Sequence, residues 1–413
     1  MRTRFTWVLG ILALIAIGFL IACSTKYSSS ANGLVIVPTQ GSAVMQTFSL
    51  NLNTGGITQI NNAAGPPTPG LPTGVVLDPA GKFAYVIVMQ NSQLPGSSTG
   101  IAVFPVGSDG KLAAASATTP FNPLGSVPVV PAALAIDSAG KFLFVANSVT
   151  NGVPGTVSVF AVSNGSLTEV ANSPFPVPLG AEGPANLTAL AVSPTAFPPL
   201  FAACSQKAAP TSENLYVTDS ENNMVWEFGV SSSGTLVSPP GDQSILGFPT
   251  GTLPSGIAID PCNRFAYIAD QSPDNRISAY TVCNTVALPS CTIADGSLVE
   301  VSGSPFANQG IDPGPMTEDP FGNHLYVVNT SSSTISGYKI SSVTGALTAM
   351  TPATVATNSK PVSIAVRSDG NWLFVANFNS ANVSQYAITP ASGRLTPQTG
   401  FATDNFPFGV AVK

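Results

Sequence analysis

The stretch from residue 131 to residue 167 decides the fold, because it contains four short segments with the periodicity of β-strands. It reads Pro131-Ala-Ala-Leu-Ala-Ile-Asp137, Gly140-Lys-Phe-Leu-Phe-Val-Ala-Asn147, Thr156-Val-Ser-Val-Phe-Ala-Val162 and Gly165-Ser-Leu167. Apolar residues alternate with small or polar ones, as they do in strands. Gly, Pro, Asp and Asn separate the segments, and these residues favour turns. The stretch therefore predicts four strands joined by turns.

This four-segment unit recurs along the chain with a period of about 46 to 70 residues. The second segment carries an aromatic residue at a fixed place, namely Tyr85, Phe144, Tyr216, Tyr267, Tyr326 and Phe374. The third segment has an aliphatic residue followed three positions later by an aromatic one, and Gly-x-Leu closes most units. Repeats of four short strands at such spacing are typical of β-propeller blades. We expect an all-β fold of four-stranded antiparallel blades.

The two ends of the chain complete the count of blades. Pro407 to Lys413 is a first segment with nothing after it, whereas Leu34 to Ile57 is a unit that lacks its first segment. Together they make one blade, and six whole units precede the last segment. We therefore predict seven blades over residues 33–413, with the C-terminal strand pairing with the N-terminal blade. Such pairing closes the ring and removes its open edges.

Composition limits the partners and cofactors of this chain. Charged residues are 8% of the sequence, against roughly a quarter in an average domain. The net charge is −6, and no Lys/Arg cluster lies beyond the N-terminus. We therefore expect no nucleic-acid partner. We also predict no cofactor, no metal and a monomer.

The N-terminus has the pattern of a secretion signal. Arg2 and Arg4 precede the apolar run of residues 7–21, which ends in Leu20-Ile-Ala-Cys23. This end resembles a bacterial lipobox, and the resemblance implies lipidation of Cys23 after removal of residues 1–22. Residues 23–32 would form a polar tether to the membrane. We predict an extracytoplasmic protein of the cell envelope, anchored at the outer membrane or the periplasmic face. An uncleaved signal anchor is the alternative.

The four remaining cysteines favour an oxidising compartment. They are confined to two neighbouring units, at Cys204, Cys262, Cys283 and Cys291. Cys204 and Cys262 occupy equivalent turns of adjacent units, so we expect one disulfide between them and another between Cys283 and Cys291. A zinc site is the alternative, but it lacks a Cys-x-x-Cys pair and an accompanying histidine.

Several short motifs resemble those of one large propeller group. Tyr216-Val-Thr-Asp219, Tyr326-Val-Val-Asn329 and Phe374-Val-Ala-Asn377 resemble its Tyr-Val-Thr-Asn repeat. Asp-Pro-x-Gly-Lys at residues 78–82 and Thr-Gly-Ala-Leu at residues 344–347 are similar to its turns. Together these motifs look like the seven-bladed lactonase family, which includes proteins resembling 6-phosphogluconolactonases and muconate-type cycloisomerases. The resemblance implies the fold, and it leaves the chemistry open.

A set of polar residues ends the second strand of nearly every unit. They are Asn147, Asp219, Asp270, Asn329 and Asn377. The loops that follow open on the face that also carries the connections between units, where propellers usually bind ligands. We predict ligand binding there, with capping of each residue's own loop as the structural alternative. Asp219 and Asp270 lie on adjacent units and are the place to look for a cation, since oxygen ligands suit calcium.

Three residues are weak catalytic candidates. Glu318 occupies a position that is aliphatic in every other unit, and an ion pair with Arg367 of the next unit is its simplest explanation. His324 is the only histidine and an obvious general base, but it stands where other units have an aromatic residue. No nucleophile motif or phosphate loop is present in the sequence.

These features favour a lipid-anchored module that binds a protein partner or a small carbohydrate-like ligand on the channel face. The alternative is a lactonase-like hydrolase that acts on a sugar lactone or small ester at the central channel. Hydrolysis requires an activated water and a group that stabilises the oxyanion, and the sequence shows few ionisable residues for either task.

Overall fold

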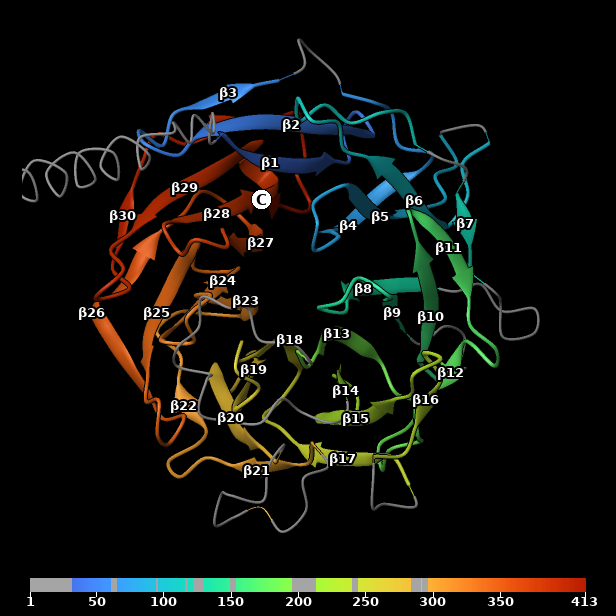
Figure 1. The fold of residues 1–413 in the computed structure, drawn as a ribbon. Coiled ribbons are helices and arrows are strands. Elements are labelled where there is room, and N and C mark those ends of the chain that lie inside the picture. The colour runs from blue at the N-terminus through green and yellow to red at the C-terminus, as the bar shows by residue number, and fades with distance from the viewer. Residues whose placement is uncertain are drawn as a thin grey trace, which may run out of the picture.

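The structure, a computed structural model, forms a ring of seven β-sheets around a central axis (Figure 1). It describes residues 32–60, 65–93, 96–115, 118–121, 130–148, 154–194, 213–239, 244–283, 291 and 296–413. The predicted all-β, seven-bladed propeller of four-stranded antiparallel blades is confirmed. Within these ranges no helix is long and apolar enough to cross a membrane. The predicted signal peptide, Cys23 and the tether up to residue 31 lie outside them.

Each blade is one antiparallel sheet whose first strand lies nearest the axis. Blade 1 contains β4 (Leu71–Leu77), β5 (Phe83–Met89), β6 (Gly100–Pro105) and β7 (Thr119–Pro120). Blade 2 contains β8 (Val130–Ile136), β9 (Phe142–Ser148), β10 (Thr156–Ser163), β11 (Ser166–Glu169) and β12 (Phe175–Pro176). Blade 3 contains β13 (Leu187–Val192), β14 (Glu213–Asp219), β15 (Met224–Val230), β16 (Leu236–Val237) and β17 (Leu246–Pro249).

The second half of the ring repeats this order. Blade 4 contains β18 (Pro254–Ile259), β19 (Phe265–Asp270), β20 (Arg276–Val282), β21 (Leu298–Glu300) and β22 (Phe306–Ala307). Blade 5 contains β23 (Pro313–Glu318), β24 (His324–Asn329), β25 (Thr334–Ile340) and β26 (Leu347–Ala356). Blade 6 contains β27 (Pro361–Val366), β28 (Trp372–Asn377), the 3-10 turn η2 (Phe378–Ser380), β29 (Asn382–Ile388), β30 (Leu395–Pro397) and β31 (Phe401–Ala402).

Blade 7 is assembled from both ends of the chain, as predicted. Its strands are β32 (Ala411–Val412), β1 (Asn32–Thr39), β2 (Val44–Asn51) and β3 (Ile57–Gln59). Val412 pairs with Val35 in the register of β32 and β1. The backbones of Leu34 and Lys413 exchange hydrogen bonds of 3.1 and 2.9 Å. The first and last strands thus lie side by side and close the ring (Figure 1).

The strand order gives the ring two different faces. On one, which we call the connection face, the second strand of each blade ends and the chain passes to the next blade. On the other, the turn face, the first strand turns into the second and the third into the fourth. Because the turns recur in each blade, side chains at equivalent positions reach the same face all around the ring.

The seams between blades explain why aromatic residues and Gly-x-Leu recur in the sequence. Gly345, at φ +74°, lies so close to Phe265 of the preceding blade that a Cβ at this glycine would be 2.5 Å from the ring. Equivalent pairs are Gly165 with Phe83, Gly234 with Phe142, Gly393 with His324 and Gly55 with Trp372. A side chain is excluded by both the backbone conformation and the contact, so these glycines set the spacing of the blades.

Buried tyrosines tie the same turns to the preceding blade. The hydroxyl groups of Tyr216, Tyr267 and Tyr326 donate hydrogen bonds of 2.6 to 2.9 Å to the carbonyl oxygens of Gly296, Gly345 and Gly393. A buried hydroxyl without a partner is costly, so these bonds fix the register of one blade against the next. The aromatic side chain in the seam and the tyrosine hydroxyl therefore hold the same turn against the preceding blade.

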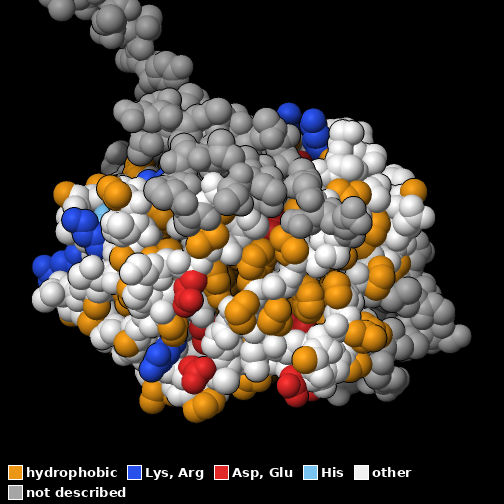
Figure 2. All heavy atoms as spheres, turned by 90° about the horizontal axis from the view of Figure 1, so that it is seen from below, with side chains coloured by type: hydrophobic (Ala, Val, Ile, Leu, Met, Phe, Trp, Pro, Cys, Tyr) orange, Lys and Arg blue, Asp and Glu red, His pale blue; other side chains and the backbone are white. Residues whose placement is uncertain are grey.

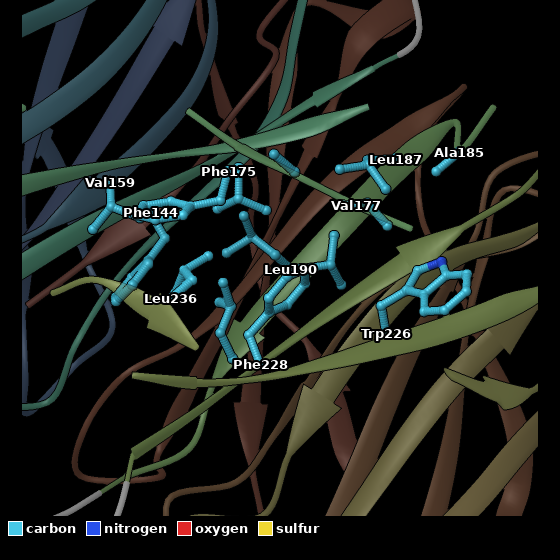
Figure 3. Packing of buried hydrophobic residues seen from close by; sticks show 14 of the residues in the cluster. Phe144, Val159, Phe175, Val177, Ala185, Leu187, Leu190, Trp226, Phe228 and Leu236 are labelled. Atoms are coloured by element: carbon cyan, nitrogen blue, oxygen red, sulfur yellow. The ribbon is translucent and has the colours of Figure 1, made fainter. Parts of the chain in front are cut away.

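Apolar side chains fill the space between neighbouring sheets. Between blades 2 and 3, Phe144 and Val159 meet Phe228 and Leu236 in one continuous cluster (Figure 3). Similar clusters occupy the other seams, and most of their members are fully buried. Burial of this kind stabilises by roughly 25 cal/mol per Å² of apolar surface. The hydrophobic core is thus distributed over the interfaces between neighbouring blades. These packed interfaces position the loops of the connection face.

Candidate functional site at the channel mouth

The five residues predicted to bind a ligand are buried inside their own blades. Asn147, Asp219, Asp270, Asn329 and Asn377 are each between 0% and 2% exposed. The amide groups of Asn147, Asn329 and Asn377 donate hydrogen bonds to a serine on the neighbouring third strand, at 2.8 to 3.0 Å. Asp219 accepts hydrogen bonds from Trp226 and Asn222. These contacts agree with the structural alternative, in which each residue stabilises its own blade. Ligand binding by these five residues stays a prediction.

Asp270 differs from the three asparagines of this set in charge and from Asp219 in its hydrogen bonds. Its Oδ2 accepts a hydrogen bond of 2.7 Å from Ser278, whereas its Oδ1 has no partner. Burial raises the pKa of this carboxyl to about 7, although bonds from Ser278 and Gly251 oppose the shift. The amide oxygens of Asn147 and Asn377 also lack partners, but they carry no charge. The Asp270 carboxyl therefore changes its charge near neutral pH.

Glu318 lies in the seam between blades 4 and 5, and the predicted ion pair with Arg367 is wrong. Neither carboxyl oxygen of Glu318 has a hydrogen-bond partner. Burial raises the pKa of Glu318 well above its usual value, and the carboxylates of Asp260 and Asp319 raise it further. The side chain faces the preceding blade, as the aliphatic residues at this position do in other blades. A protonated Glu318 suits such surroundings because a buried charge without a partner is costly.

His324 and Arg367 have structural partners at the turn face. His324 is 3% exposed, packs on Gly393 in the seam, and places Nδ1 2.6 Å from Oδ2 of Asp319. The guanidinium group of Arg367 pairs with Asp369 and donates a 3.1 Å bond to the carbonyl oxygen of Lys413. The three catalytic candidates therefore lie on the turn face, where they make seam and turn contacts.

The cysteine predictions are confirmed where the structure describes them. Cys283 and Cys291 form a disulfide that closes the connection between the third and fourth strands of blade 4. Cys262 is also disulfide-bonded. Its predicted partner, Cys204, lies outside the described residues. Among the described residues, no three His, Cys, Asp or Glu side chains gather closely enough to hold a metal ion.

The connection face carries an aromatic platform that the sequence analysis missed. It consists of Phe378, Phe406 and Phe408, at the inner ends of blades 6 and 7. The rings of Phe378 and Phe406 stack with centroids 4.9 Å apart, and Phe408 meets Phe378 edge-on at 5.8 Å. The ammonium group of Lys360 lies 4.7 Å from the centroid of Phe378. Phe406 is 44% exposed, so a large apolar surface with a cation beside it faces solvent.

The backbone holds this platform in an unusual conformation. Phe406 and Lys360 each precede the proline that opens a first strand, and both have positive φ, at 61° and 53°. Leu253 and Asp312 occupy the same place in blades 4 and 5, at 50° and 53°. Non-glycine residues adopt this region at a cost of about 1–3 kcal/mol, and such positions cluster at functional sites. The turn thus presents a side chain at the channel mouth in each of these four blades.

Charge divides unevenly between the two faces. Among the described residues, the connection face carries the acidic residues Glu182, Glu221, Asp274, Asp312 and Asp404, besides the buried Asp219 and Asp270, but only the basic residues Arg276 and Lys360. Most of the other described Lys and Arg residues lie on the turn face. An acidic channel mouth repels phosphorylated compounds, which proteins bind with several basic groups or backbone amides. The face is better suited to a neutral ligand.

Comparison with known proteins supports the same fold and identifies the family. The sequence profile of the family described as "Lactonase, 7-bladed beta-propeller" matches residues 21–184 and 316–410, together more than half of the chain. The chain belongs to this lactonase family. The unmatched middle, residues 185–315, corresponds to blades 3 and 4 with their flanking connections. Comparison with curated protein sequences found no significant match.

Several solved structures share the ring at low sequence identity. A candidate 6-phosphogluconolactonase from Bacteroides fragilis is 17% identical, with a TM-score of 0.70 over 94% of this chain and 100% of that one. The periplasmic gluconolactonase of Pseudomonas aeruginosa is 17% identical, with a TM-score of 0.69 over 92% of this chain and 99% of that one. At such identity these similarities show the fold.

Proposed function

We propose that this member of the lactonase family hydrolyses a small, unphosphorylated sugar lactone at the channel mouth of its connection face. Family membership is the observation that carries the proposal. The periplasmic gluconolactonase among the similar structures supports the substrate class, because its name specifies a lactone without phosphate. The acidic character of the connection face also favours a neutral substrate over a phosphorylated one.

The aromatic platform supplies the binding surface in this proposal. The C–H face of a sugar lactone packs on Phe406 and Phe378, and its polar edge stays in contact with water and with Lys360. The ammonium group of Lys360 stabilises the negative charge that develops on the carbonyl oxygen when water attacks. Because these groups are held by a strained, hydrogen-bonded backbone, they are in place before the substrate arrives.

We assign the proton transfer to Asp404, which lies two residues before Phe406. Its Oδ2 accepts a 2.7 Å hydrogen bond from Ser42, and its backbone N–H donates to Gln46 at 2.9 Å. Asp404 accepts a proton from the attacking water, the water oxygen bonds to the carbonyl carbon, and the ring C–O bond breaks. The proton then passes to the departing ring oxygen, which leaves the open hydroxy acid.

Hydrolysis of gluconolactone by the purified protein, measured above the spontaneous rate in matched buffer, tests this proposal. Phe406→Gly removes the ring and suits the positive φ, so we expect a folded variant whose KM rises at least tenfold. Asp404→Asn should lower kcat about a hundredfold, the usual scale for one acid–base group. Leu253→Gly makes the same backbone change in blade 4 and serves as the matched control, with wild-type kinetics expected.

Three outcomes would each overturn a part of the assignment. If wild-type protein hydrolyses neither five- nor six-membered neutral lactones above the spontaneous rate, the propeller is a binding module and lacks lactonase activity. If 6-phosphogluconolactone is turned over faster than gluconolactone, the proposed preference for a neutral substrate is wrong. Equal kinetics of the Asp404→Asn variant and the wild type would remove Asp404 from the mechanism.

We also propose that the protein is anchored outside the cytoplasm through a lipid on Cys23. Residue 32 opens β1 at the turn face, so a short tether would hold that face toward the membrane and leave the channel mouth directed away from it. Palmitate labelling of the mature chain is expected, together with accumulation of precursor in a Cys23→Ala variant. Normal processing of that variant would contradict lipidation.

A further inference from the structure

A cavity lies between blades 3 and 4 at the outer part of the ring, away from the aromatic platform of blades 6 and 7. Its volume is about 340 Å³, which is within the range of small-molecule sites. Phe248, Thr250 and Gly251 line it from the connection, whereas Ser278, Tyr280 and Glu300 line it from blade 4. The edge that carries β17, β20 and β21 faces the viewer in Figure 2, where exposed hydrophobic side chains lie among a few acidic ones.

The carboxyl group of Asp270 lies directly behind this wall. Ser278 donates its hydroxyl proton to Asp270, and the Ser278 oxygen accepts a 3.3 Å bond from the backbone N–H of Gly251. A Cβ at residue 251 would lie 2.7 Å from the Asp270 carboxyl carbon, so the glycine lets the connection pass this close. The Ser278 hydroxyl and the Gly251 backbone, which both line the cavity, are thus in direct contact with the carboxyl group.

Blade 5 shows how this arrangement is completed elsewhere in the ring. There Asn329 stands in place of Asp270, and Asn308 in the preceding connection donates a 2.7 Å bond to its Oδ1. The equivalent of Asn308 in blade 4 is Thr250, because the backbone N–H groups of these two residues make the same bond, to the carbonyl oxygens of Asn275 and Asn223 respectively. Thr250 has no amide group, and its hydroxyl donates a 2.9 Å bond to the carbonyl oxygen of Gly251. The donor that satisfies blade 5 is thus missing from blade 4, where the group behind the wall is an acid.

We propose that the cavity binds a small organic compound with a primary ammonium group. Asp270 lies behind the wall and Glu300 lines it, so both supply negative charge, and none of the described residues that line the cavity is basic. Ser278 presents the remaining lone pair of its oxygen to the ligand, because its proton is held by Asp270 and Gly251 N–H occupies the other lone pair. The rings of Tyr280 and Phe248 suit the apolar body of such a ligand and attract its cation. This site is separate from the proposed lactonase site and independent of it.

Ionisation of Asp270 gives the site a pH dependence. Its carboxyl has a pKa of about 7, so raising the pH from 6 to 8 adds negative charge behind Ser278. The other charged groups that face this carboxyl are Asp274, whose pKa is lowered by a hydrogen bond from Thr252, together with Arg276 and Glu300. A ligand cation should therefore bind more tightly at pH 8 than at pH 6, and the difference should vanish with Asp270.

Calorimetric titration with cyclohexylammonium and its neutral analogue cyclohexanol tests the proposal on the whole protein. We expect saturable binding of the ammonium compound, at least tenfold tighter than the alcohol at pH 8. Asp270→Asn recreates the residue of blade 5 and should fold, yet it should lose that tenfold preference. Thr250→Asn should close the cavity by restoring the missing amide, whereas Ser336→Ala, at the blade 5 position equivalent to Ser278, should leave binding unchanged.

Three results would each overturn the proposal. These are no saturable binding of cyclohexylammonium to the wild type, equal affinity for cyclohexanol, or an unchanged preference in a folded Asp270→Asn variant. Lactone hydrolysis is measured separately, so neither result depends on the other.

Discussion

Blades 3 and 4 share the frame of the other five blades but differ from them in polar chemistry. The family profile matches the chain on both sides of them and not within them. Yet Tyr216 and Tyr267 bind the next blade's glycine in the same way as Tyr326 does in blade 5. The ring therefore requires the seam contacts, whereas the residues around them are free to vary.

The differences in blades 3 and 4 concern buried polar groups. Asp219 and Asp270 replace the asparagines that end the second strand in blades 2, 5 and 6. Asn214 takes the place of the seam aromatic and donates a 2.6 Å bond to buried Glu227. The disulfide between Cys283 and Cys291 is here as well. A buried polar group must find a partner or shift its pKa, so these substitutions change the electrostatics of blades 3 and 4 while the seams stay the same.

The largest effect is expected from removing the strand that closes the ring. Deleting residues 408–413 removes β32 together with Val410 and exposes the apolar seams on both sides of blade 7. We expect loss of cooperative unfolding in thermal and denaturant melts, since an opened ring loses contacts at both ends. A truncated protein that melts like the full chain would show that the seams hold without closure.

The seam aromatics provide a direct test that the frame is common to both regions. Phe265→Ala in blade 4 and Trp372→Ala in blade 6 each remove the ring that packs on a glycine of the next blade. We expect each variant to lose about 3–5 kcal/mol of unfolding free energy, as buried aromatic truncations do. Denaturant melts measure both. A cost in blade 4 under a quarter of that in blade 6 would mean that the two regions are built differently.

At the position that ends the second strand, a pH dependence of stability should come from Asp270 of blade 4 and not from Asn329 of blade 5. Because the pKa of Asp270 is raised to about 7 in the folded state, its contribution is fully present below the unfolded pKa and is lost as pH rises from about 4 to 7. The loss is at most about 4 kcal/mol. Asp270→Asn should flatten this part of the curve in denaturant melts at several pH values.

Asn329→Asp is the matched variant in blade 5. Its new carboxyl would still accept a bond from Asn308, so we expect a weaker pH dependence than Asp270 produces. A pH slope as steep as that of the wild-type Asp270 would show that the missing amide donor does not explain the difference between the blades.

The smallest effect is expected from the disulfide of blade 4. Cys283 and Cys291 close a short loop with a sequence separation of 8, so their removal constrains the unfolded chain little. A paired Cys283→Ser, Cys291→Ser variant should lose about 2 kcal/mol of unfolding free energy. Melts of this variant under non-reducing conditions measure the loss. A cost as large as that of Phe265→Ala would mean that the connection between the third and fourth strands supports the seam.

The sequence predicted the positions of the strands well and the roles of polar residues poorly. Strand alternation and turn residues are local signals, so the segments, the split blade and the pairing of Cys283 with Cys291 followed from spacing alone. The expected ion pair between Glu318 and Arg367 was wrong, because sequence position does not show which way a side chain faces. Glu318 faces blade 4, whereas Arg367 pairs within its own turn with Asp369.

The channel mouth could be found only from the folded ring. Phe378 and Phe406 are 28 residues apart and resemble ordinary loop residues, and neither belongs to the repeated pattern. They stack because ring closure brings the last connection of the chain beside the loop of blade 6. The missing amide donor at Thr250 likewise becomes visible only when blade 4 is compared with blade 5.

By itself, the sequence determined that this chain is a closed seven-bladed ring, because the repeat carries the strand period, the turn residues and the seam contacts in every unit. The tertiary structure decided which buried polar groups have hydrogen-bond partners, which carboxyl oxygens have none, and which aromatic rings meet at the channel mouth. Those properties depend on distances between residues that are remote in sequence, and burial and charge follow from these distances.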